Sequence, residues 1–132
     1  MTIWILAVLG LFIAQTLLPS AILASSFRNR KLQRDYILGP RDISPPMPGA
    51  GERAERALNN MKEALPVFVT LALLAAIQGT STTTSAQTGA MVFFFARLLY
   101  VPAYISGIRG IRSSLWVVSM GGLGMLTYGL LN

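Results

Sequence analysis

Hydrophobic residues are gathered into four long runs along the chain, and polar residues lie mainly between these runs. A helix needs about 17–25 largely apolar residues to cross the hydrocarbon core of a bilayer, and each run is long enough. The runs therefore predict an all-α integral membrane protein. We expect one four-helix membrane domain over 1–132, with helices at about 3–25, 52–79, 87–108 and 115–131 and a long connection at 26–51.

The composition supports a membrane protein and excludes several kinds of chemistry. The chain is 53% hydrophobic and only 12% charged, which is unlike a soluble domain. The formal charge of +6 comes from Lys and Arg residues beside the hydrophobic runs. This placement favours contact with anionic membrane lipids over binding of nucleic acid. The sequence has no Cys and no His, so we expect no cysteine thiolate, no imidazole base and no metal site within the protein itself.

The basic residues also indicate the orientation in the membrane. A cluster from Arg28 to Arg34 follows the first hydrophobic run, whereas no Lys or Arg precedes that run. This order favours a retained transmembrane helix over a signal peptide. The turn at 79–89 carries no charge. By the positive-inside rule we expect both charged connections, 26–51 and 106–114, in the cytoplasm and both termini outside. We prefer this role for the basic cluster over a part in ligand binding.

Two polar stripes interrupt the hydrophobic helices. Arg56, Asn60 and Glu63 follow the spacing i, i+4, i+7 at the start of the second helix, so they share one helix face. This stripe offers a cation, an amide and a carboxylate where water gives way to lipid. A ligand carrying both charge signs fits such a stripe, and so does a buried polar network that locks the helices together.

Arg97, Tyr100 and Tyr104 form a second stripe on the third helix, at i, i+3 and i+7. Arg97 lies roughly midway along its span, where a lone arginine costs about 3 kcal/mol or more. It therefore needs a partner. Glu63 is the acidic residue close to a hydrophobic run, so we expect a Glu63–Arg97 pair. Arg97 itself is equally compatible with a purely structural role.

The two stripes belong to longer motifs that resemble a known family. The pattern Glu52-Arg53-x-x-Arg56-Ala57-x-x-Asn60-x-x-Glu63-x-x-Pro66-x-Phe68 resembles the signature of the MAPEG family, the membrane-associated proteins in eicosanoid and glutathione metabolism. The stretch Ala96-Arg97-Leu98-x-Tyr100-x-x-x-Tyr104 is similar to the third-helix motif of the same family. The order of four hydrophobic spans agrees, so the resemblance covers essentially the whole chain.

The resemblance implies a homotrimer of four-helix protomers that binds glutathione between neighbouring subunits, near the cytoplasmic face. It implies glutathione contacts from both stripes, namely Arg56, Asn60, Glu63, Arg97, Tyr100 and Tyr104. Arg112 and Ser113 resemble the Arg-Ser pair of the prostaglandin-synthase branch, which implies that they activate the thiol; Arg109 is the alternative cation. The chain resembles a bacterial-type member, which implies the bacterial inner membrane.

The function implied by the resemblance is a glutathione-dependent transferase or peroxidase that acts on lipophilic electrophiles. Two other classes stay open from the residues alone. One is a small transporter in which Glu63 relays protons or binds cations. The other is a membrane protein that binds or scaffolds without catalysis, and therefore forms no thiolate. Proteoliposome flux and a test for glutathione thiolate distinguish these three classes.

Overall fold

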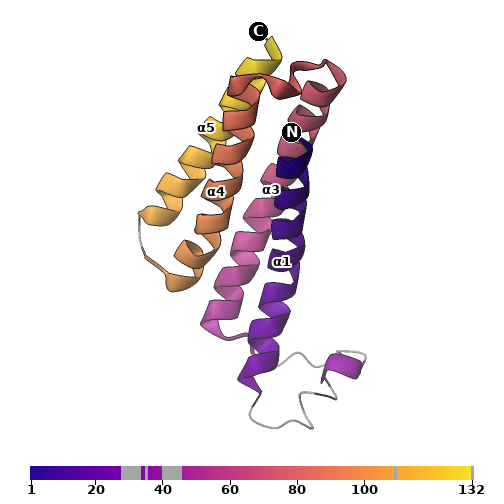
Figure 1. Cartoon of the computed structure of the whole chain (residues 1–132). Coiled ribbons are helices and arrows are strands. Elements are labelled where there is room, and N and C mark those ends of the chain that lie inside the picture. Colours follow the sequence, from indigo (N-terminus) through magenta and orange to yellow (C-terminus); the bar gives the residue numbers. More distant parts are fainter. Residues whose placement is uncertain (28–33, 35, 40–45, 109, 132) are drawn as a thin grey trace.

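Four long helices make up most of the protein (Figure 1). The computed structural model describes residues 1–27, 34, 36–39, 46–108 and 110–131. The helices are α1 (Thr2–Ser26), α3 (Gly49–Ile77), α4 (Thr84–Ser106) and α5 (Ile111–Leu131), and the short 3₁₀ helix η1 (Thr80–Thr82) joins α3 to α4. All four long helices have the length and composition to cross a membrane. The prediction of an all-α membrane protein with four spans is confirmed.

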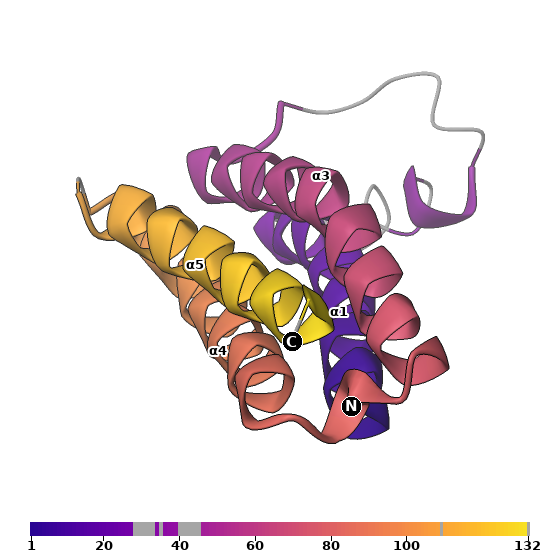
Figure 2. The same cartoon turned by 90° about the horizontal axis from the view of Figure 1, so that it is seen from above.

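The helices form two pairs, α4 with α5 and α1 with α3, as the view along the bundle shows (Figure 2). Both chain termini and η1 lie at one end of the bundle (Figure 1). The opposite end holds the last turn of α1, the first turn of α3, the last turn of α4 and the first turn of α5. We call this second end the polar end. The charged residues that begin α3 therefore lie at the same end as Arg112 in α5.

The pair α4–α5 packs with its backbones unusually close because glycines face each other. A Cβ atom added at Gly89 would lie 2.6 Å from the carbonyl oxygen of Gly122, and one added at Gly122 would lie 2.8 Å from that of Gly89. Gly129 makes a similar approach to Ala86. Small residues of α5 thus form its contact with α4, as is common between membrane helices. A Cβ atom added at Gly121 or Gly124 would meet no other part of the described structure within 4 Å.

Aromatic packing holds α3 against α4 further along the bundle from the polar end. Phe68 and Phe93 are fully buried and stack with ring centroids 4.6 Å apart and an interplanar angle of 8°. Met61 and Leu126 belong to the same core. At the other end of the bundle, Trp4 Nε1 donates a hydrogen bond of 3.1 Å to the side-chain oxygen of Gln87 and so links α1 to α4. These contacts fix the helices that carry the two polar stripes.

Two helices begin earlier than expected, because polar residues that we had placed in turns belong to the first turn of the helix. We expected the third helix from residue 87, but α4 begins at Thr84 because the Thr83 hydroxyl accepts a hydrogen bond of 3.3 Å from Ala86 N and caps the helix. We expected the fourth helix from 115, but α5 begins at Ile111. Gly107 and Gly110 take positive φ values of 74° and 89°, so the turn between the helices is complete before Arg112.

Candidate functional site

Three helices surround an open cavity of about 250 Å³ near the polar end. It is lined by Asn60 of α3, Tyr100 of α4, and Arg112, Ser113 and Trp116 of α5. The sequence singled out the first four of these residues, and the structure brings them together. It did not indicate Trp116. Because α5 begins at Ile111, Trp116 follows Arg112 by one helical turn, and this spacing is the signal by which Trp116 could have been found.

Arg97 is the buried charge next to the cavity, and its partner is Asn60. The side chain is 1% exposed, and its Nη1 donates a hydrogen bond of 2.6 Å to Asn60 Oδ1. The guanidinium carbon lies 5.4 Å from the centre of the Phe93 ring and 5.6 Å from that of Tyr100. Nε and Nη2 have no hydrogen-bond partner among the described residues. Arg97 therefore orients the cavity residue Asn60 rather than lining the cavity itself.

The expected Glu63–Arg97 pair is wrong. Glu63 is exposed on α3 and, among the described residues, makes no ion pair with Arg97. Asn60, three residues before Glu63 on α3, accepts the hydrogen bond from Arg97 instead. A neutral amide oxygen takes the role that we had assigned to a carboxylate. The charge of Arg97 is balanced locally by dipoles and ring faces, not by a counterion in hydrogen-bond contact.

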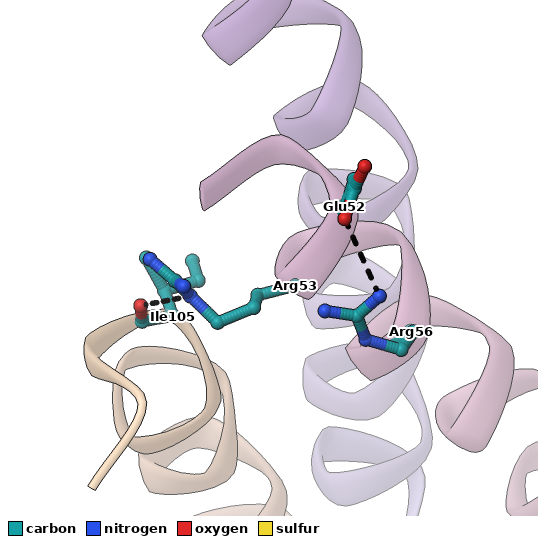
Figure 3. Close-up of polar contacts among 4 residues, drawn as sticks. All are labelled: Glu52, Arg53, Arg56 and Ile105. Carbon is teal, nitrogen blue, oxygen red and sulfur yellow. Dashed lines mark hydrogen bonds and ion pairs between the residues drawn. The ribbon is translucent and has the colours of Figure 1, made fainter. Parts of the chain in front are cut away.

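Arg56 and Glu63 are exposed on α3 and do not line the cavity. Arg56 Nη1 lies 3.6 Å from Glu52 Oε2 in an exposed ion pair (Figure 3). Such an exposed pair is worth at most about 1 kcal/mol, so it leaves Arg56 available to a ligand. Of the stripe formed by Arg56, Asn60 and Glu63, only Asn60 reaches the cavity. The stripe therefore runs from the cavity on to the outer surface.

Arg53 makes a contact between α3 and α4 that the sequence did not indicate. Its Nε donates a hydrogen bond of 2.7 Å to the carbonyl oxygen of Ile105, and Figure 3 shows it reaching across to α4 while Arg56 turns to Glu52. The carbonyls in the last turn of a helix have no partner within the helix and carry partial negative charge. Arg53 satisfies one of them. It thereby holds the start of α3 to the end of α4 at the polar end.

Arg112 lies between two cavities. Its guanidinium carbon is 4.8 Å from the centre of the Tyr104 ring, and the Tyr104 ring is 5.4 Å from that of Tyr100. Besides the larger cavity, Arg112 lines a smaller one of about 90 Å³ together with Tyr104 and Gly107. The tyrosine face favours a cation above it. Tyr104 therefore places the charge of Arg112 at the edge of the larger cavity, although its own side chain lines only the smaller one. Arg109, the alternative cation, lies outside the described residues.

The cavity suits an anion. It offers the guanidinium of Arg112, the hydroxyls of Tyr100 and Ser113, and the amide of Asn60, and none of the described residues that line it is acidic. Cations and hydroxyl donors stabilise a thiolate or carboxylate. In the part of the chain that the structure describes, no group of three His, Cys, Asp or Glu residues is placed to hold a metal ion.

Comparison with known proteins agrees with the four-helix fold. The MAPEG family model matches residues 5–132, which is nearly the whole chain and includes every residue of the cavity. No curated protein matches the sequence.

Proposed function

The chain belongs to the MAPEG family, and from this premise we propose that it is a membrane-bound, glutathione-dependent transferase or peroxidase that acts on lipophilic electrophiles. Family members in general use glutathione as a substrate or cofactor. The observation that carries the proposal is the cavity at the polar end, where Arg112, Ser113 and Tyr100 meet without an acidic neighbour among the described lining residues. That set of groups favours a thiolate over a thiol.

Glutathione is held along the polar stripe of α3. The peptide carries two carboxylates and one ammonium group, so Arg56 binds a carboxylate and Glu63 binds the ammonium group on the outer face of the helix. Asn60, where the stripe enters the cavity, takes a peptide group. This path leads the cysteine of glutathione toward Arg112. Arg97 contributes by fixing Asn60, at 2.6 Å, rather than by reaching the peptide along this path.

The protein is a homotrimer in this proposal. Arg56 and Glu63 are exposed in the single chain, and a peptide lying on them would be open to water on one side. A neighbouring subunit against this face of α3 closes the site. Chemical crosslinking in detergent should therefore stop at three subunits. A ladder that ends at two, or a monomer by native mass measurement, contradicts this arrangement.

Thiol activation needs no side-chain base in this mechanism. A free cysteine thiol has a pKa of about 8.5, and a fixed guanidinium beside the sulfur lowers the pKa because it stabilises the charged form. The proton leaves to water at the open cavity. The thiolate then attacks an electrophilic carbon, forms the S–C bond, and the leaving group departs with its electron pair. With a hydroperoxide, the thiolate sulfur attacks the terminal oxygen, the O–O bond breaks, and the alkoxide leaves and takes a proton from water. A second glutathione then attacks the sulfenic acid, which gives the disulfide and releases water.

Ultraviolet difference spectroscopy tests the proposal directly. Glutathione added to the purified protein at neutral pH should give the thiolate absorbance, whereas S-methylglutathione, which has no thiol, should bind without it. Turnover of a lipophilic aryl halide should follow the thiolate signal. Glutathione binding without any thiolate absorbance would contradict the transferase mechanism and favour a binding protein without catalysis.

We also propose that the polar end faces the cytoplasm, with both chain termini outside, in the bacterial inner membrane. Arg53, Arg56 and Arg112 lie at this end, and the turn around η1 at the other end carries no charge. The positive-inside rule supports this orientation. An accessibility tag at Thr82 should react from outside intact cells. Of the basic cluster, the residues Arg28, Arg30 and Lys31 lie outside the described residues.

A further inference from the structure

A second, apolar groove of about 340 Å³ lies between α1 and α4. Leu11 and Leu18 line it from α1, and Leu98, Leu99 and Pro102 line it from α4. Both helices are membrane spans, so the groove opens at bilayer depth. None of the described residues that line it also lines the cavity at Arg112. Its volume is within the range of small-molecule sites, about 300–1,000 Å³.

One polar side chain lines this groove, and its oxygen has no partner. Gln15 is 4% exposed, and its Oε1 is buried without a hydrogen bond among the described residues. Gln15 lies near the middle of α1 (Thr2–Ser26). Water does not compensate a buried amide at this depth, so an unpaired amide oxygen there is unfavourable. A partner supplied by a bound molecule removes this cost.

Two prolines add further acceptors at the same place. Proline has no N–H and cannot donate to the carbonyl four residues before it. Pro19 inside α1 therefore leaves the carbonyl of Gln15 without its usual donor, and Pro102 inside α4 does the same for Leu98. Gln15 and Leu98 both line the groove. The groove is thus lined by apolar side chains, but it also holds the unpaired Oε1 of Gln15 and two backbone carbonyls that lack their usual helical donor.

We propose that this groove binds a lipophilic alcohol or phenol, with the hydroxyl paired to Gln15 and the hydrocarbon part lying between the leucines. A hydroxyl both donates to Oε1 and accepts from the amide N–H, so it matches a glutamine side chain from either side. A plain hydrocarbon leaves Oε1 unpaired. A charged head group has no counterion among the described groove residues and carries a large desolvation cost. The site is independent of the glutathione site and does not rest on the function proposed above.

Photolabelling in lipid nanodiscs tests the proposal with two matched probes. One is a medium-chain alkanol that carries a diazirine; the other is the diazirine alkane of the same length, which lacks the hydroxyl. The alkanol should label peptides of α1 and α4, and excess unlabelled alkanol should displace it. Gln15→Leu should lower alkanol labelling by about tenfold, the effect of one lost hydrogen bond in apolar surroundings, and leave alkane labelling unchanged.

Thr16→Val is the control for a polar-to-apolar change in the same turn of α1. Thr16 is exposed, does not line the groove, and its hydroxyl already donates to Phe12 O at 2.7 Å. Labelling of the Thr16→Val variant should therefore equal that of the parent protein. Gln15→Leu removes an unpaired polar group, so it should melt at or above the parent temperature. Leu98→Trp fills the groove and should reduce labelling by both probes.

Three results would overturn the proposal. Equal labelling by alkanol and alkane, or no effect of Gln15→Leu, would mean that the groove is ordinary lipid-facing surface. The third concerns a second copy of the chain. The sequence has no cysteine, so Ala14→Cys introduces a unique thiol beside the groove. Efficient crosslinking of two chains through this thiol would show that another subunit covers the site.

Discussion

The guanidinium of Arg97 donates a hydrogen bond of 2.6 Å to the amide oxygen of Asn60, and this pair joins α4 to α3 beneath the cavity. Arg97 is among the largest fully buried side chains of the protein. A charge at this depth is tolerated because Asn60 and the faces of Phe93 and Tyr100 surround it. The pair therefore couples the stability of the bundle to the geometry of the site.

Removal of Asn60 should destabilise the protein strongly. Asn60→Leu leaves the guanidinium buried without the hydrogen bond that the described structure shows, and the expected loss is about 3 kcal/mol of unfolding free energy. Arg97→Met combined with Asn60→Leu should recover part of the loss, because neither polar group then stays unpaired. Thermal melting in detergent measures all three variants.

Asn59→Leu is the control for this cycle. Asn59 is exposed and its side chain accepts a hydrogen bond from the exposed Lys62, so the melting temperature of this variant should change little. Glu63→Gln combined with Arg97→Met should give nearly additive effects, because the two side chains make no ion pair in the described structure. A strong coupling between Glu63 and Arg97, with none between Asn60 and Arg97, would contradict this account.

The stripes could be predicted because helical spacing fixes which residues share a face. That geometry placed Asn60 on one stripe and Tyr100 on another, whereas the resemblance to the MAPEG family implied that both stripes contact one ligand. It could not identify the partner of Arg97, because the rotation of α3 against α4 depends on packing by Phe68 and Phe93. The sequence favoured Glu63 as the partner of Arg97 only because its carboxylate carries the opposite charge. Packing favoured the amide that lies closer.

The start of α5 could not be predicted for a related reason. Arg112 and Ser113 are polar and follow Gly110, so the sequence favoured a turn that includes them. The positive φ of Gly107 and Gly110 completes the turn earlier, and the helix then begins at Ile111. Trp116 was missed with it. Arg53 was missed because its partner is a backbone carbonyl, of Ile105, which no side-chain pattern reveals.

The close approach of α4 and α5 predicts a sharp difference between two glycines of the same helix. Gly122→Ala places a methyl group 2.8 Å from the carbonyl oxygen of Gly89 and should destabilise by about 1–3 kcal/mol, because backbone atoms cannot move aside easily. Gly124→Ala meets nothing within 4 Å among the described residues, so it should be neutral or stabilising by up to about 1 kcal/mol. Melting temperatures of the two variants decide the point; equal losses would mean that α4 and α5 are further apart.

Trp116 should report ligand binding by fluorescence. The protein has two tryptophans, and Trp4 lies at the other end of the bundle, bonded to Gln87. In a Trp4→Phe background all indole emission comes from Trp116, which lines the cavity with Arg112. Glutathione should change this emission with saturation, and S-methylglutathione should do the same. The reverse background, Trp116→Phe, should show no saturable change. A signal that persists in Trp116→Phe would place the ligand elsewhere.

The last prediction concerns the cation at the thiol. Arg112 is the charged residue that lines the cavity in the described structure, and its guanidinium is held 4.8 Å above the Tyr104 ring. Arg112→Ala should remove the thiolate absorbance and most of the turnover, because the thiol pKa returns toward its free value of about 8.5. Glutathione should still quench or enhance Trp116 emission, since Arg56, Asn60 and Glu63 remain.

Further variants distinguish the effect of the charge at Arg112 from the effect of its position. Arg112→Lys keeps the charge but loses the planar group that rests on Tyr104, so it should restore only part of the thiolate signal. Ser113→Ala removes one hydroxyl donor and should have a smaller effect than Arg112→Ala, since a neutral donor stabilises an anion less than a cation does. Arg109→Ala should leave the thiolate largely intact. If Arg109→Ala abolishes the signal and Arg112→Ala does not, the cation that activates glutathione lies in the turn before α5 rather than in its first turn.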